Sequence, residues 1–168
     1  MASLDPSLRR RARPSARTKL RPVKPATPPS APFEQPLVAH AADIDELGHV
    51  SNIVVVRWIQ EVAKAHSRAV GWDHAAYLRA GAVFVVRRHE IDYLGPVLEG
   101  DALVLRTFVA AWSAATSERR TTITRVSDGR EMTRAVTLWA FVNLRTGRPT
   151  RIPEALPAAF AGAPASFV

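Results

Sequence analysis

The feature that most constrains this chain is one long amphipathic helix. Apolar and polar positions alternate at helical spacing from residue 53 onward, and the pattern stops near Gly71. It predicts a helix of about five turns over residues 53–70, with Ser51 or Asn52 as its N-cap. The apolar stripe comprises Val55, Ile59, Val62, His66 and Ala69, and the polar stripe Arg57, Glu61, Lys64 and Arg68. Such a helix must bury one side against a second layer.

Strand patterns surround this helix and supply the second layer. Glycine-containing turns separate them, and Asp128-Gly129 is a typical two-residue hairpin turn. Strands are predicted at 37–42, 82–93, 102–112, 117–126 and 131–143, with a short helix at 73–80. The fold class is therefore α+β, with a five-stranded antiparallel sheet packed on one long helix. A single sheet of this kind leaves edges exposed, so we expect a partner subunit.

Composition sets the limits of this fold. The chain has 168 residues, 47% of them apolar, which is enough to bury the core of one domain. The absence of cysteine excludes disulfides and thiolate chemistry. No apolar run approaches the roughly 20 residues that a membrane span requires. We therefore expect a soluble, cytoplasmic protein that does not enter a membrane.

The net charge of +8 is concentrated at the N-terminus. Residues 1–35 hold eight Lys/Arg against two Asp/Glu, whereas residues 36–168 are nearly neutral. This Pro/Arg-rich extension is predicted to be disordered, and the domain to occupy 36–168. The extension has three candidate roles: a solvated segment without specific function, a contact with a polyanion or partner, or targeting. Because the domain itself carries little net charge, we do not expect nucleic-acid binding.

The stretch just before the helix is the candidate functional site. Asp43, Asp45, Gly48 and His49 lie within seven residues, directly ahead of Ser51 and the helix start. A helix N-terminus offers free N–H groups that can bind an oxyanion, and a nearby carboxylate can act as a base. Ordinary readings stand beside this one: Asp45 as a turn or capping residue, Gly48 as a loop glycine, and His49 as a packing residue.

Other common site types are missing from the sequence. There is no H-E-x-x-H motif, no G-x-S-x-G nucleophile elbow and no phosphate-binding glycine loop. The five histidines are scattered, and no cysteine can assist them as a metal ligand. We therefore predict no metal and no cofactor.

The order of several short motifs resembles the 4-hydroxybenzoyl-CoA thioesterase-like family. The segment Asp45-Glu-Leu-Gly48-His49-Val50-Ser51-Asn52 is similar to that family's D-x-x-G-H-V-N-N signature. Further similar segments follow in order: 92–96, 99–101, Ser117, 141–144, 147–149 and 152–154. The resemblance implies a hotdog fold, acyl-CoA thioesterase activity, and active sites at the interface of a homodimer or homotetramer. Coenzyme A would then be part of the substrate.

The resemblance also implies roles for individual residues. Asp45 matches the catalytic aspartate, as nucleophile or general base, and the backbone N–H of Asn52 matches the group that polarises the thioester carbonyl. Gly48 and His49 would line the reacting centre, and Val50 the substrate. Glu61 lies where related enzymes place a glutamate, but ion pairing with Arg57 or Lys64 is the alternative.

Substrate binding is less defined. Four arginines, on strands that we expect to be adjacent, are candidates for the CoA phosphates, with solvated surface charge as the alternative: Arg87, Arg88, Arg119 and Arg120. Ser51 and Val55 depart from the family pattern near the acyl site, so an aliphatic and a small aryl acyl group both stay open. CoA and acyl carrier protein both stay open as the carrier, and a non-catalytic hotdog module that binds acyl thioesters or a partner is the alternative function.

Overall fold

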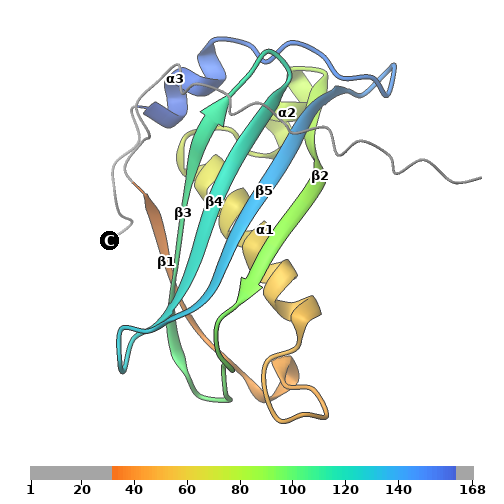
Figure 1. The fold of residues 1–168 in the computed structure, drawn as a ribbon. Helices are drawn as coiled ribbons and strands as arrows, with labels where there is room; N and C mark the ends of the chain where they lie inside the picture. The colour runs from red at the N-terminus through yellow and green to blue at the C-terminus, as the bar shows by residue number, and fades with distance from the viewer. Residues whose placement is uncertain (1–31, 162–168) are drawn as a thin grey trace, which may run out of the picture.

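The computed structural model describes residues 32–161, in which five antiparallel strands form one sheet against a long helix (Figure 1). The predicted disorder of the N-terminal extension concerns residues that are almost all outside this range. The strand order is β1-β3-β4-β5-β2. The strands are β1 (Phe33–Val38), β2 (Ala82–Tyr93), β3 (Ala102–Trp112), β4 (Thr116–Arg125) and β5 (Glu131–Asn143).

β2, β3 and β5 have the predicted bounds, β4 is shifted by one residue, and the first strand differs most. β1 runs from Phe33 to Val38, whereas a strand at 37–42 was predicted. Its register with β3, from Phe33 opposite Thr107 to Val38 opposite Ala102, explains the difference. The buried Phe33 side chain anchors the early start, and Ala41–Asp43 forms a single 3₁₀ turn, η2. Pro36 is tolerated because β1 is an edge strand.

The sheet is not a simple meander. β3, β4 and β5 follow one another, but β2 pairs with the far side of β5 and forms the second edge. The expectation that the two arginine pairs lie on adjacent strands is therefore wrong, because β5 separates β2 from β4. β2 also contains a β-bulge between Val86 and Arg88. Its outer edge has no strand partner within the described chain.

The long helix α1 (Asn52–Ala69) lies across one face of the sheet (Figure 1). The Ser51 side chain accepts a hydrogen bond from the Val54 N–H and caps its N-terminus. The β-branched run at the helix start is accommodated because Val54 and Val55 are buried in the core. Two short helices, α2 (His74–Arg79) and α3 (Ala155–Ala161), flank the other end of α1.

The core divides along α1 into two clusters. The larger one packs Ile59 and Val62 of α1 against Leu103, Leu105 and Ile123 of the sheet. The smaller one lies near α3 and contains Phe141, Leu156 and Phe160 among its buried members. Within residues 32–161 no helix combines the length and apolarity needed to cross a membrane. The two core clusters give the two ends of α1 different surroundings.

Candidate active site

A tight loop before α1 carries the predicted catalytic residues. Ile44 and Val50 form an isolated antiparallel bridge, and the Asp45 N–H donates to the His49 carbonyl at 3.0 Å. The Gly48 N–H donates to the Asp45 carbonyl at 3.0 Å, and Gly48 adopts φ 79°. No atom lies within 4 Å of the position a Cβ would occupy at Gly48, so glycine is required here for its backbone conformation. The loop is a small hairpin-like turn.

The side chains of Asp45 and His49 lie on the same side of this loop. The Leu47 N–H donates to Oδ1 of Asp45 at 2.9 Å, a bond typical of aspartates in turns. Nδ1 of His49 lies 3.8 Å from the same oxygen. The Asp45 side chain is 27% exposed and the His49 side chain is 38% exposed. Oδ2 of Asp45 has no hydrogen-bond partner among residues 32–161, so the carboxylate keeps a free oxygen.

The N-terminus of α1 follows directly. Ser51 satisfies the Val54 N–H, but the N–H groups of Asn52 and Ile53 have no acceptor within the described chain. Both residues are exposed, and Ile53 is 82% exposed although its side chain is apolar. Free N–H groups at a helix N-terminus bind negative charge. The end of α1 can therefore receive an oxyanion, and Asn52 does not cap the helix with its side chain.

Asp43 has a different role from Asp45. It is 7% exposed, and its carboxylate accepts hydrogen bonds from Arg57 on α1 at 2.5 Å and from the His40 N–H at 3.1 Å. Its carbonyl accepts the Ser51 N–H. Asp43 therefore clamps the loop onto α1. The exposed Glu61 pairs with Lys64 at 2.8 Å, and Arg57 is not its partner.

The structure does not bring together Val50 and the four arginines that were predicted to bind substrate. Val50 is 5% exposed and belongs to the larger core cluster, so it supports the loop from beneath. Arg87 and Arg88 are exposed at the bulge of the edge strand β2, and Arg88 pairs with Glu90 at 3.2 Å. Arg120 is exposed and pairs with Glu118 at 3.3 Å. Arg119 points to the opposite face and is 5% exposed, since successive strand residues alternate.

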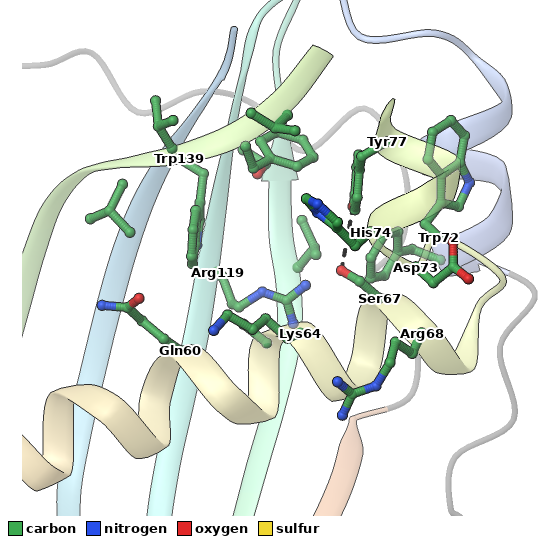
Figure 2. Close-up of a pocket in the computed structure, with 18 of the residues that line it drawn as sticks. Gln60, Lys64, Ser67, Arg68, Trp72, Asp73, His74, Tyr77, Arg119 and Trp139 are labelled. Carbon is green, nitrogen blue, oxygen red and sulfur yellow. Dashed lines mark hydrogen bonds between the residues drawn. The ribbon is translucent and has the colours of Figure 1, made fainter. Parts of the chain in front are cut away.

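A cavity of about 690 Å³ lies at the other end of α1 (Figure 2). Its walls are α1 from Gln60 to Arg68, α2, the first half of β2 and the inner face of the sheet, with Phe160 of α3. Gln60 and Arg68 are 8 and 16 residues beyond Asn52, so the cavity begins about 12 Å along α1 and extends to about 24 Å. The sequence did not predict it, because its residues come from seven elements. Six aromatic residues line it: Trp72, Tyr77, Phe84, Trp112, Trp139 and Phe160.

Burial shifts the pKa values of several groups around this cavity. Burial first, and then the positive charge of Arg119, lower the pKa of His66 to about 3. Burial lowers the pKa of Arg119 to about 10, so the guanidinium stays protonated at neutral pH. Burial likewise raises the pKa of Tyr77. Arg119 is therefore a buried cation beside a neutral histidine.

Metal-binding side chains do not gather anywhere in the described chain. Among residues 32–161 no group of three or more His, Asp or Glu is placed to hold a metal ion. The candidate chemistry therefore rests on the carboxylate, the imidazole and the helix N-terminus at one end of α1, and on the cavity at the other.

Solved structures share this fold at low sequence identity. The 1,4-dihydroxy-2-naphthoyl-CoA thioesterase from Synechocystis has a TM-score of 0.72 and 17% identity, over 78% of this chain and 96% of that one. Staphylococcus aureus SAV2348, solved in complex with CoA, has a TM-score of 0.73 and 15% identity, over 79% and 83%. DHNA-CoA thioesterase from Staphylococcus aureus has a TM-score of 0.69 and 17% identity, over 76% and 85%. These similarities confirm the five-stranded hotdog arrangement.

Sequence comparison gives the family. Curated proteins give no significant match to this chain. The family described as the thioesterase-like superfamily matches residues 39–160, which include the Asp45 loop, all of α1 and four of the five strands. Since that match spans most of the chain, this protein belongs to the thioesterase-like superfamily.

Proposed function

We propose that the protein is an acyl-CoA thioesterase of the 4-hydroxybenzoyl-CoA thioesterase type, with Asp45 as its catalytic carboxylate. One observation carries the proposal: a loop holding Asp45 and His49 precedes a helix whose first two N–H groups are free. Thioester hydrolysis needs a nucleophile or base, and a group that stabilises the negative charge on the carbonyl oxygen. The loop offers the first and the Asn52 N–H the second.

Asp45 can act by two routes with the same atom. As nucleophile, its free Oδ2 attacks the thioester carbonyl, the C–S bond breaks, and water hydrolyses the resulting anhydride. As general base, it takes a proton from a water molecule that attacks the carbonyl; the C–S bond then breaks, and the CoA thiolate leaves and takes up that proton. In both routes Leu47 holds Oδ1 and fixes the orientation of the carboxylate. His49, 3.8 Å away, lies within reach to exchange a proton with the site after a small movement.

The separation of loop and cavity leads us to propose that a second copy completes the site. The Val50 N–H donates to the Val97 carbonyl, which places the Asp45 loop near the Tyr93 end of β2. Val83, Val85 and Val86 line the cavity at the opposite end of β2. If two copies pair antiparallel along their free β2 edges, a two-fold axis brings the loop of one copy to the cavity of the other. Arg87 and Arg88 at this edge are then candidates for the CoA phosphates.

Substitution of Asp45 by Asn tests the catalytic role. Asn keeps an oxygen for the Leu47 N–H, so the loop should keep its shape, but it can neither attack nor take a proton. We expect kcat for thiol release to fall about a hundred-fold or more, with Tm unchanged. The panel uses short, long and aryl acyl-CoAs, and Glu46→Gln in the same loop is the matched control. Near-wild-type hydrolysis by Asp45→Asn would remove the assignment.

One observation favours a second function, a non-catalytic module that binds acyl thioesters. The Leu47 hydrogen bond to Asp45 is the bond of an ordinary turn aspartate, which needs no catalytic role. The two functions differ in one assay. Tight binding of acyl-CoA by the wild-type chain without thiol release, across the panel, would replace the enzyme by the module.

A mixing experiment tests the shared site. Asp45→Asn is combined with a variant whose cavity is filled, Val109→Trp, and the two inactive proteins are allowed to exchange subunits. If each site joins the loop of one copy to the cavity of the other, mixed dimers contain one intact site, and about a quarter of wild-type activity returns. If each chain holds a complete site, every site stays defective and no activity returns.

A further inference from the structure

Arg119 is a buried cation that no carboxylate of the described chain neutralises. Its Nη1 donates to Nδ1 of His66 at 3.0 Å and to Oγ1 of Thr107 at 3.2 Å. Both acceptors are neutral: Thr107 offers a hydroxyl oxygen, and burial keeps His66 unprotonated. The centroid of the Phe160 ring lies 5.5 Å from Cζ of Arg119. Charged side chains are almost never buried without a charged partner, so the missing anion calls for an explanation.

The unused part of Arg119 faces the cavity. A guanidinium has five N–H groups, and Nη1 uses both of its own on His66 and Thr107. Nε and Nη2 donate to no acceptor within residues 32–161. Arg119 lines the cavity, and Figure 2 shows it among the lining side chains above α1. Nε and Nη2 form the pair of parallel donors that binds a carboxylate through two hydrogen bonds.

A second lining residue also lacks an acceptor. Nε1 of Trp139 is buried and has no hydrogen-bond partner among the described residues, although an indole N–H can only donate. Trp139 and Arg119 lie on the neighbouring strands β5 and β4 and both border the cavity. Nε1 of Trp139 is itself fully buried, so the unpaired donors that the cavity can offer to a ligand are those of Arg119. A ligand with acceptor oxygens would satisfy the Arg119 donors, whereas a purely hydrocarbon ligand would not.

The charged side chains around the cavity are mostly positive. Lys64 and Arg68 lie on its rim beside the buried Arg119, and Asp73 is the one carboxylate among the lining residues. Asp73 is exposed and its Oδ1 caps α2 by accepting the Ala76 N–H at 2.8 Å. It makes no ion pair with Arg119 or any other described residue. The cavity is therefore apolar and aromatic in its walls and cationic in its charge.

We propose that this cavity binds an acyl group whose far end carries a carboxylate, held by Nε and Nη2 of Arg119. The proposal rests on the proposed thioesterase function and names its substrate class, an ω-carboxyacyl thioester. The hydrocarbon part of the acyl group contacts the aromatic walls, and the terminal carboxylate neutralises the buried guanidinium. An acyl group that ends in a methyl leaves the three N–H groups without acceptors, which penalises its binding.

The first experiment measures thiol release from acyl-CoA pairs of equal chain length. Adipyl-CoA is compared with hexanoyl-CoA, and suberyl-CoA with octanoyl-CoA. We expect kcat/KM of the wild-type protein to favour the ω-carboxyacyl member by about ten- to a hundred-fold. Arg119→Met should remove or reverse this preference while retaining hydrolysis of the methyl-ended member. Arg134→Met, the same change at an exposed position of β5, is the control and should keep the preference.

The second experiment measures binding without turnover. Hexanoate carries an alkyl chain and a carboxylate, and hexanamide has the same shape without the charge. Calorimetry should show that Arg119→Met weakens hexanoate binding about ten-fold or more and leaves hexanamide binding unchanged. Inorganic phosphate should not displace hexanoate, because the aromatic walls contribute to its binding. Arg119→Lys, which keeps the charge without the fork, should weaken hexanoate binding less than Arg119→Met.

The outcomes separate the two proposals. Hexanoate binding that depends on Arg119, without hydrolysis of any thioester, keeps the inference and removes the thioesterase. Hydrolysis without a preference for ω-carboxyacyl chains, or with a preference that Arg119→Met retains, overturns the inference and leaves the thioesterase. Displacement of hexanoate by inorganic phosphate at equal concentration would also overturn it. If Arg119→Met does not fold, the wild-type preference and Arg119→Lys decide.

Discussion

The two ends of α1 differ in their exposure to solvent and in the side chains around them. At its N-terminus, Asp45, His49 and the free N–H groups lie in a loop open to solvent, where reacting groups can be reached. At its C-terminal half, aromatic side chains and Arg119 form a cavity whose one buried charge lacks a counter-charge. The difference teaches that chemistry and recognition can be placed at opposite ends of one helix. Changes at one end should then leave the other unaffected, and each prediction below tests this separation.

The largest effect on stability is expected at the N-terminal end, from Asp43→Ala. This change removes the buried carboxylate that joins Arg57 and the His40 N–H. We expect the free energy of unfolding to fall by about 2 to 3 kcal/mol, because hydrogen bonds to a charged group are lost. Activity should fall as well, since the loop is no longer held on α1. Urea unfolding and thiol release measure the two effects.

Glu61→Ala is the control for that change. Glu61 lies on the same helix and pairs with Lys64, but both side chains are about half exposed. We expect its loss to change stability by less than about 0.5 kcal/mol. Equal effects of Asp43→Ala and Glu61→Ala would show that the Asp43 clamp does not hold the loop. Hexanoate binding at the far cavity should be unchanged in both variants.

The next effect belongs to the cavity end and depends on pH. His66 is 1% exposed, and its pKa is about 3 in the folded state against 6.5 when unfolded. Between these values the unfolded chain takes up a proton that the folded chain does not, so stability falls as pH drops below about 6.5. From pH 6.5 to pH 5 the loss should be about 2 kcal/mol. His66→Gln keeps an acceptor for Arg119 and should flatten the pH profile over this range.

The control for His66 is His74→Gln on the exposed side of α2. It should leave the slope of stability against pH as in the wild-type protein. Urea unfolding at several pH values measures this slope. A His66→Gln protein that loses stability below pH 6.5 as steeply as wild type would show that another group, such as the partly buried His89, dominates.

The smallest effect separates the loop from the rest of the molecule. Gly48 and Gly129 both adopt positive φ, at 79° and 67°, and neither has an atom within 4 Å of the position that a Cβ would occupy. Changing either one to Ala should destabilise the protein by about 1 kcal/mol. Only Gly48→Ala should also lower kcat, because only that loop carries Asp45. Equal kcat values for the two variants would argue that the loop geometry is irrelevant to catalysis.

Local patterns predicted much of this molecule. The bounds of β2, β3 and β5 follow from strand patterns that end at glycine turns, and α1 follows from its apolar stripe. Asp45 stood out because residues 45–52 resemble the signature of the 4-hydroxybenzoyl-CoA thioesterase-like family, whereas its spacing alone left a turn or capping role open. These features are local, since each depends on residues close together in the sequence.

Features that depend on distant residues could not be predicted. The resemblance favoured Asp45 over Asp43, but the role of Asp43 in holding the loop on α1 depends on Arg57, which lies 14 residues away in the sequence. The sequence could not show that Arg119 points inward, because β4 is polar on both faces. Ser117 and Thr121 share the face of Arg119, and Thr122 lies on the other face. The position of β2 at the edge next to β5 is likewise set by pairing across the sheet rather than by its own residues.

The bulge in β2 determines which side chains of this strand face α1. Arg87 is one residue too many for the pairing with β5, so the strand changes phase between Val86 and Arg88. With it, Val86, His89 and Ile91 lie opposite Trp139, Thr137 and Ala135. Without it, uniform alternation would turn Arg88, Glu90 and Asp92 toward α1. A single extra residue thus keeps the charged side chains of Arg88, Glu90 and Asp92 on the face of the sheet away from α1.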